Sequence, residues 1–238
     1  MTYFKIRYNP NKYYGFSITG YFLNKVSLLN EIDWKISTTP VPYLDAVSFM
    51  EQRVSQIHKG TSPELIWLLE HPPIYTLGTS ADPKDVLRTD VPTFETGRGG
   101  QVTFHGPGQR VIYVLLDLSR RGRDLRAYIA TLEDWIISVL KILNIKAERR
   151  SGRVGLWVTN PDASEDKIAA IGVRIRRWVT YHGMALNVFP DLSYFEGIVP
   201  CGLKNFGVTS LEKLGSETSM TIIDSLLQKQ AKIFFGKK

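Results

Sequence analysis

The stretch that decides the fold is DKIAAIGVRIRRWVTYHGMALNVF, residues 166–189. In its first part Ile171, Val173 and Ile175 alternate with arginines or a glycine, and a second apolar run follows at residues 183–189. Such alternation is typical of a β-strand with one face in water. Two strand-like segments with no helix between them favour a sheet that is mixed and largely antiparallel.

Three further apolar runs predict strands. ELIWLLE is too short for a comfortable helix and has prolines on both sides, and VIYVLLDL has the same buried character. VGLWVT is a third strand-like run. The runs occupy residues 64–70, 111–118 and 154–159.

Apolar residues three and four positions apart predict helices. The first spans residues 43–58, with Leu44 and Val47 on its apolar face. The longest begins after an N-cap at Asp124 and continues to Leu143.

Two shorter helices are expected near the C-terminal end. Thr209 and Glu212 have the spacing of a capping box, which predicts a short helix, and a last amphipathic helix runs through residues 220–234. Together the elements predict an α+β fold, a mixed and largely antiparallel sheet with packed helices.

The composition is that of a globular protein. The chain has 238 residues, 43% hydrophobic and 22% charged, which excludes a mainly disordered state and allows a sizeable core. No run approaches about 18 uncharged apolar residues, and the start lacks the pattern of a secretory signal. Cys201 is the single cysteine, so no intramolecular disulfide can form. A cytoplasmic protein without membrane contact is expected.

The first 33 residues differ from the rest. Four basic residues precede Glu31, the first acidic residue of the chain. This composition is typical either of a loosely packed extension or of an organelle transit peptide. We expect residues 1–33 to be an extension of unknown role and residues 34–238 to be the catalytic domain.

The formal net charge is +7, which favours encounters with acidic partners without saying of which kind. Basic residues gather in three clusters, although such runs are often merely solvated faces. The clusters are Arg120, Arg121, Arg123 and Arg126; Lys146, Arg149, Arg150 and Arg153; and Arg174, Arg176 and Arg177.

Several common catalytic motifs are absent from the sequence. It has no phosphate-binding loop, no dinucleotide fingerprint and no HExxH helix. Its four histidines are far apart and lack the spacing of metal ligands. We therefore expect no metal and no cofactor.

The segment TGRGGQVTFHGPGQ, residues 96–109, holds five glycines around Arg98. Glycines let backbone N–H groups approach a ligand, and an arginine adds a fork of donors. A tight hairpin turn is the alternative, but interleaved polar residues favour a binding loop. These residues are Gln101, Thr103, His105 and Gln109.

Three more residues carry possible chemistry. Cys201 lies between Pro200 and Gly202, and is either an inert core thiol or an approachable nucleophile followed by a free N–H. Lys167 opens an apolar run, either as a surface lysine or, if partly buried, as a proton carrier. His182 is either a cavity wall or a core histidine.

Five segments, taken in order, resemble the lipoyl(octanoyl) transferase B family, the octanoyltransferases of lipoic acid biosynthesis. The resemblance covers roughly residues 34–215. The segments are EHPPIYTLG (70–78), RGGQVTFHGPGQ (98–109), KIAAIGVR (167–174), HGMALN (182–187) and IVPCG (198–202).

The resemblance implies the fold of biotin and lipoate protein ligases and transfer of an octanoyl (or lipoyl) group. The donor would be acyl carrier protein, and the acceptor a lysine on the lipoyl domains of 2-oxoacid dehydrogenases or on the glycine cleavage H protein. Cys201 would be the acyl-thioester nucleophile and Lys167 its activating partner. The implied substrate contacts are Arg98, Gly99, Gly100, Gln101, Val102, Thr103, Phe104, His105, Ala170, Ile171, Gly172, Gly183, Met184 and Ala185.

Two alternatives stay open on the sequence. An ATP-dependent lipoate or biotin ligase of the same fold would use Lys167 but would not need Cys201. A nucleic-acid-binding module would use the basic clusters, but no recognised motif accompanies them, so no nucleic-acid partner is expected.

Overall fold

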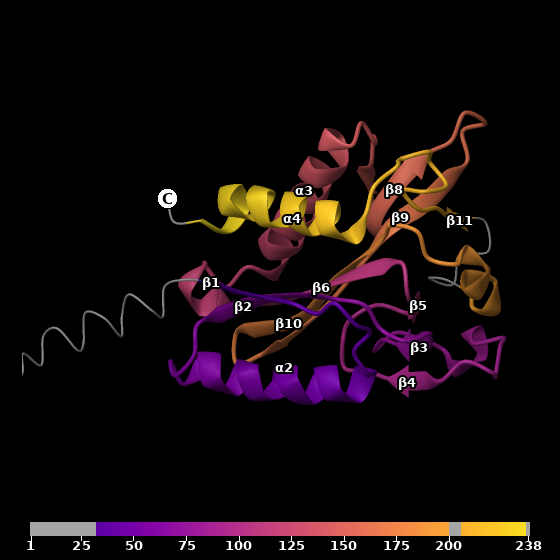
Figure 1. Cartoon of the computed structure of the whole chain (residues 1–238). Coiled ribbons are helices and arrows are strands. Elements are labelled where there is room, and N and C mark those ends of the chain that lie inside the picture. Colours follow the sequence, from indigo (N-terminus) through magenta and orange to yellow (C-terminus); the bar gives the residue numbers. More distant parts are fainter. Residues whose placement is uncertain (1–31, 200–205, 237–238) are drawn as a thin grey trace, which may run out of the picture.

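The computed structural model describes residues 32–199 and 206–236. Its main sheet has the strand order β1-β2-β6-β10-β9-β8-β7, with β11 paired to β9, and a second sheet has the order β4-β3-β5 (Figure 1). The strands are β1 (Ile32–Ile36), β2 (Glu64–Leu69), β3 (Ile74–Leu77), β4 (Thr93–Glu95), β5 (Val102–His105), β6 (Gln109–Leu115), β7 (Glu148–Arg150), β8 (Arg153–Thr159), β9 (Glu165–Arg176), β10 (Val179–Asn187) and β11 (Gly207–Val208).

The main sheet is mixed and largely antiparallel, as predicted. Its parallel pairs are β1 with β2 and β11 with β9, and the other pairs are antiparallel. The predicted extension, residues 1–33, lies outside the described residues except for its last two. Those two, Ile32 and Asp33, already belong to β1.

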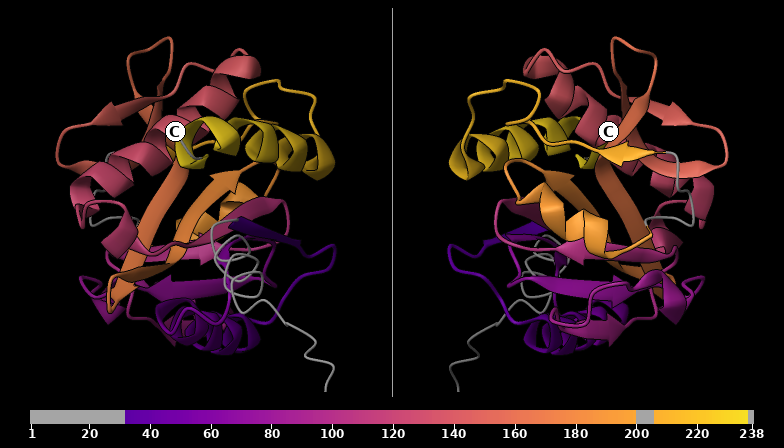
Figure 2. Two further views of the ribbon diagram at one scale, coloured as in Figure 1. Left: turned by 90° about the vertical axis from the view of Figure 1, so that its left-hand side faces the viewer. Right: turned by 90° about the vertical axis from the view of Figure 1, so that its right-hand side faces the viewer.

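Three helices cover the two faces of the main sheet (Figure 2). Helix α2 (Tyr43–His58) packs on one face, and α3 (Leu125–Ile142) and α4 (Met220–Phe235) pack on the other. The predicted N-cap of α3 is confirmed, because the Asp124 carboxylate accepts hydrogen bonds from two backbone amides of the first turn. None of the helices in the described ranges is both long and apolar enough to cross a membrane.

The buried face of α2 differs slightly from the apolar face that the sequence predicts. Leu44, predicted on the apolar face, is 62% exposed, whereas Tyr43 and Ala46 are buried. The buried face of the helix is therefore turned slightly from the predicted one, and it includes Met50. The aromatic ring of Tyr43 lies edge-on to His71, which holds this orientation.

Strand boundaries differ from the predicted ones by a few residues. The run 111–118 is a strand only to Leu115, because residues 118–120 form a 3-10 turn. The strand predicted from the apolar run at residues 183–189 starts earlier in the structure, at Val179, and ends at Asn187. Propensity could not show this, because pairing with neighbouring strands sets where each strand ends.

The predicted short helix after Thr209 is wrong. Residues 211–215 form a single hydrogen-bonded turn. The first two amides of this turn donate to the carbonyls of Asn187 and Val188, so tertiary pairing with the end of β10 replaces a helix cap.

Candidate active site

A cavity of about 420 Å³ lies where the small sheet meets strands β9 and β10 of the main sheet. Strands β8 and β11 and the N-terminal end of α2 also supply side chains to it. Most of the residues that the sequence singles out line this one cavity. They are Lys167, Arg98, Gly100, Gln101, Val102, Thr103, His105, Ala170, Ile171, Gly172, Gly183, Met184 and Ala185.

Gly99 and Phe104, also predicted to contact the substrate, do not line the cavity. The Gly99 amide donates to the Val173 carbonyl at 3.0 Å, which attaches the glycine-rich segment to β9. The Phe104 ring stacks on Tyr194, with ring centroids 4.6 Å apart, in a core beneath the small sheet. Cys201 lies outside the described residues, and Phe206, five positions later, lines the cavity.

The segment predicted as a binding loop is partly a strand. Residues 102–105 form β5, which pairs antiparallel with β3, and Gly106–Gly108 turns the chain into β6. Glycine is needed at Gly108, where a side chain would lie 2.5 Å from the Phe189 carbonyl oxygen. The tight hairpin turn, the alternative interpretation, is present, and the predicted binding loop stays a prediction, although several residues of the segment line the cavity.

Arg98 is buried, and its guanidinium binds backbone carbonyls of the cavity wall. It donates to the carbonyl oxygens of Thr76 at 2.7 Å and of Gln101 and Gly99, each at 3.0 Å. Charge-assisted bonds of this kind are stronger than neutral ones. Arg98 thus holds the glycine-rich segment against β3 while it lines the cavity.

Lys167 lies near the start of β9, as its third residue, and is half-buried. Its Cα pairs with Trp157 on β8 and with Val208 on β11, so its backbone is fixed from both sides. Its Nζ lies 4.7 Å from the centroid of the Trp157 ring. Its side chain therefore lies on the wall of a mostly apolar cavity.

A buried amide network supports the opposite wall. His105 Nδ1 lies 2.7 Å from Gln109 Oε1, and the Gln109 amide donates to Asn187 Oδ1 at 2.9 Å. Burial lowers the pKa of His105 to about 3. His105 is therefore neutral near pH 7, and its Nδ1 donates to Gln109.

His182 is a second neutral imidazole of the cavity. Burial, followed by the charge of Arg98, lowers its pKa to about 3. Its backbone has φ +59° in the middle of β10, a strained conformation for a residue other than glycine. Its ring stacks on Tyr181 and lies edge-on to Tyr113. The residue is a cavity wall, as one of the two sequence interpretations has it.

Small residues on β9 and β10 bring the backbones close to their neighbours. Gly172 pairs with Gly183 across the two strands. A side chain at Gly183 would lie 2.2 Å from the Ile112 carbonyl oxygen, and one at Gly172 would lie 3.0 Å from Arg98 Cδ. Packing therefore requires glycine at Gly183, whereas a side chain at Gly172 would make a tight contact with Arg98.

The sequence did not identify Trp157, Arg153 and Phe206 as site residues. All three line the cavity, on β8 and beside β11. A β-bulge between Leu156 and Trp157 shifts the register of β8 against β9 and places Trp157 opposite Lys167. Nothing in the run VGLWVT shows this bulge.

A mostly apolar cavity with cationic side chains on its wall has the size and lining of a small-molecule site. Among the described residues, no three His, Cys, Asp or Glu side chains gather closely enough to hold a metal ion. The fold is that of an α+β domain with a mixed sheet, and this cavity is its candidate active site.

The sequence of residues 42–231 matches the lipoyl protein ligase A/B catalytic domain, and the chain belongs to this family. It is 58% identical over 206 residues to an octanoyltransferase of Paramagnetospirillum magneticum, covering 86% of this chain and 97% of the relative. It is 56% identical over 209 residues to an octanoyltransferase of Parvibaculum lavamentivorans, covering 86% of this chain and 93% of the relative. The resemblance drawn from the five segments is confirmed, and the chain is a transferase.

Solved structures confirm the predicted ligase-like fold. A bipartite lipoate protein ligase of Thermoplasma acidophilum matches with a TM-score of 0.64 at 15% identity, covering 86% of this chain and 84% of that one. A biotin protein ligase of Aquifex aeolicus, in complex with biotin and ATP, matches with a TM-score of 0.52 at 13% identity. The match covers 86% of this chain and 70% of the ligase.

Proposed function

We propose that this chain transfers an octanoyl (or lipoyl) group from acyl carrier protein to a lysine of lipoyl domains, through a thioester on Cys201. The proposal places this reaction in the cytoplasm and includes the glycine cleavage H protein among the acceptors. One observation carries it: motif residues from four separate segments meet Lys167 at a single cavity. The octanoyltransferase relatives support the choice of acyl group.

In the first half-reaction, the Cys201 thiolate attacks the carbonyl carbon of the donor thioester. A new carbon–sulfur bond forms, the bond to the carrier breaks, and the carrier sulfur leaves with a proton from the Lys167 ammonium. The products are the acyl-enzyme, a free carrier thiol and a neutral Lys167 amine. Proton donation of this type is general acid catalysis.

In the second half-reaction, neutral Lys167 takes one proton from the acceptor ammonium. The resulting amine attacks the Cys201 thioester, the carbon–sulfur bond breaks, and the proton left on nitrogen passes to water. The Cys201 thiolate and the Lys167 ammonium are thereby restored. A free lysine of pKa about 10.4 is only about 0.1% neutral near pH 7.5, a deficit of about 4 kcal/mol, so a nearby base matters here.

Stabilising the thiolate is the smaller role of Lys167. Lowering a thiol pKa from about 8.5 by two units raises the thiolate fraction about ninefold near pH 7.5. The same change lowers intrinsic nucleophilicity roughly six- to tenfold, which cancels the gain. Proton exchange is therefore the contribution that the proposal assigns to Lys167.

Mass spectrometry tests the nucleophile. After mixing with octanoyl-carrier, the peptide that holds Cys201 should carry one octanoyl group, and Cys201→Ala should carry none. A Cys201→Ser variant that turns over as fast as the native chain would contradict the thioester route. A separate reaction with free octanoate and ATP tests the ligase alternative. It should give no amide product.

Lys167→Arg tests the proton carrier, because it keeps the positive charge and removes practical proton exchange. Variant preloaded with octanoate on Cys201 should pass the group to a lipoyl domain at least tenfold more slowly than preloaded native enzyme. Normal amide transfer from the preloaded variant would contradict the role of Lys167.

Ion pairs bear on which of the three basic clusters could dock an acidic substrate. In the first cluster Arg120 pairs with Asp117 and Arg121 with Glu64. Arg149 pairs with Glu133 and Asp134, and Arg150 and Arg153 pair with Glu165, so the middle cluster is largely neutralised.

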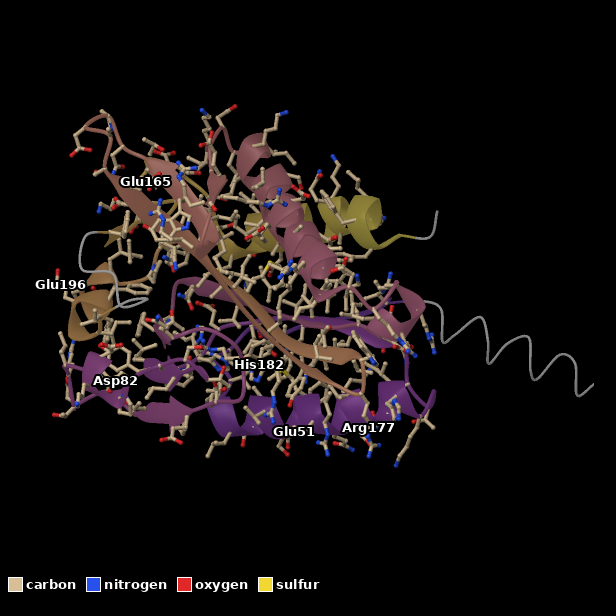
Figure 3. The ribbon with its side chains drawn as sticks, turned by 180° about the vertical axis from the view of Figure 1, so that it is seen from behind. Glu51, Asp82, Glu165, Arg177, His182 and Glu196 are labelled. Atoms are coloured by element: carbon tan, nitrogen blue, oxygen red, sulfur yellow. The ribbon has the colours of Figure 1, made fainter. Side chains whose placement is uncertain are left out.

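The other two clusters gather at one end of the molecule. The Leu118 amide donates to the Trp178 carbonyl at 2.8 Å, and the Arg123 guanidinium lies 5.6 Å from the Trp178 ring. Figure 3 shows Arg177 at this end, with Glu165 at the opposite end of the β9–β10 pair. We propose that acidic protein substrates are steered by this end.

A further inference from the structure

One aromatic ring at the cavity contacts two cations. The Trp157 ring centroid lies 4.7 Å from Lys167 Nζ and 4.7 Å from Arg153 Cζ. Trp157 is 2% exposed, so water screens these contacts weakly. Indole is the aromatic group that attracts cations most strongly, and the attraction grows when the pair is desolvated.

The ring itself cannot turn away from Lys167. Its Nε1 donates to the Arg153 carbonyl at 3.2 Å, and the Phe206 ring packs edge-on to it at 5.4 Å. The Arg153 guanidinium also lies 4.1 Å from the Phe206 ring. Trp157 is thus held on its edge and against a second aromatic ring, which gives Lys167 a fixed surface.

The local backbone leaves space for the lysine stem at this surface. Gly155 has φ +116°, and a side chain there would lie 2.7 Å from the Ala169 carbonyl oxygen and 3.4 Å from Lys167 Cε. Strand pairing fixes the Lys167 backbone, so the four-carbon stem is its movable part. The Trp157 ring is one constraint on where the ammonium at the end of that stem lies.

The two cations on the ring differ in chemistry. Arg153 stays charged, and its ion pair with Glu165 fixes its position. Lys167 must alternate between ammonium and amine in the proposed reaction. The ring attracts the ammonium and not the amine, whereas the Arg153 charge repels the ammonium. The two neighbours therefore act in opposite directions on the proton of Lys167.

We propose that Trp157 is the positioning residue of Lys167: its indole ring holds the ammonium at the cavity wall in the orientation needed for proton donation to the departing carrier sulfur. This inference rests on the proposed octanoyl transfer. It assigns Trp157 no contact with the acyl group and no chemical step of its own.

Trp157→Leu and Trp157→Phe test the inference, with Trp67→Leu as the matched control. Trp67 is an equally buried tryptophan whose ring lies 4.1 Å from the Lys35 ammonium, and it does not line the cavity. The control therefore removes a core indole and a lysine contact of similar geometry elsewhere.

The first readout is NMR and does not depend on activity. The ring current of Trp157 should shift the ε-methylene protons of Lys167 upfield, a signal assigned by its loss in Lys167→Arg. In folded Trp157→Leu the shift should disappear, and in Trp157→Phe part of it should remain. An unchanged Lys167 signal in folded Trp157→Leu would refute the contact.

The second readout is acyl-enzyme formation in a single turnover as a function of pH. Trp157→Leu should lower the maximal rate about 2- to 30-fold with little change in KM, the range expected for a cation–π contact. The alkaline limb of its rate profile should also change, because the Lys167 ammonium loses an attractive neighbour. Trp157→Phe should stay within about threefold of the native rate, and Trp67→Leu should leave the pH profile unchanged.

The outcomes separate the two proposals. If native enzyme forms the acyl-enzyme and Trp157→Leu matches its rate and pH profile, the positioning role is refuted and octanoyl transfer stands. If native enzyme forms no acyl-enzyme, the proposed function fails, the positioning role fails with it, and the NMR shift reports only whether the contact exists. If Trp157→Leu does not fold, the folded Trp157→Phe variant decides, since a native Lys167 shift with a phenyl ring would also contradict the assignment.

Discussion

Gly183→Ala should destabilise the protein strongly, because the added methyl group meets backbone and not a flexible side chain. The new Cβ would lie 2.2 Å from the Ile112 carbonyl oxygen of the paired strand β6. Ordinary carbon–oxygen contacts need about 3.3 Å, so β6 and β10 must separate by about 1 Å. Overpacking of this kind costs about 1–3 kcal/mol, and each weakened ladder hydrogen bond adds about 1 kcal/mol. We expect a loss of about 3 kcal/mol.

Gly99→Ala is the matched control, because Gly99 is also a motif glycine. A side chain there would meet the Val173 carbonyl oxygen at an ordinary 3.7 Å. Thermal unfolding followed by circular dichroism should show a Tm lower by about 6–12 °C for Gly183→Ala and by less than about 2 °C for Gly99→Ala. Equal melting temperatures would show that the β6–β10 contact is not as close as the structure has it, and our explanation of Gly183 would be wrong.

Three further outcomes are expected. Burial lowers the pKa of three histidines, His71 to about 4 and His105 and His182 to about 3, so the folded state disfavours their protonation. The stability that depends on these neutral histidines is complete above about pH 6.5 and is lost as pH falls toward 4, by about 2 kcal/mol for each histidine at pH 5. Urea unfolding at pH 7 and at pH 5 should show this loss. An equal free energy of unfolding at the two pH values would contradict the lowered pKa values. Asp124→Ala should cost about 1 kcal/mol, or about 2–4 °C in Tm, through loss of the α3 cap, whereas an unchanged Tm would mean the cap contributes nothing. Raising ionic strength should lower kcat/KM for the protein substrates, and replacing Arg176 and Arg177 by serine should weaken this dependence on salt. A kcat/KM that does not change with salt would exclude electrostatic docking.

Local patterns were sufficient where one face of an element decides its structure. The arginine alternation predicted β9, and the spacing of apolar residues with the Asp124 cap predicted α3. They were insufficient where tertiary pairing decides. Strand β5 looked like a loop because glycines surround it, and the turn at residues 211–215 looked like a helix because its amides pair with distant carbonyls.

The candidate site shows the same contrast between what local sequence patterns predict and what tertiary pairing decides. Antiparallel pairing of β9 and β10 brings Ala170 opposite Ala185 and Gly172 opposite Gly183, so two motifs separated along the chain form one cavity floor. Small residues in both motifs are visible in the sequence, and they indicate a close approach before its partner is known. Trp157 gives no such signal, because its position depends on a bulge in β8.

Pairing of β9 with β8 and β11 explains how a strand could position the proposed proton carrier, Lys167. Backbone hydrogen bonds to β8 and β11 fix the Cα of Lys167, so its ammonium can vary in position only through the four-carbon stem. The Trp157 ring adds an attraction for the charged form of that side chain. A carboxylate would favour the ammonium throughout the cycle, whereas a ring gives a weaker attraction that the neutral amine can leave. An indole opposite Lys167 therefore fits the proposed reaction, in which this residue would gain and lose its proton in every turnover.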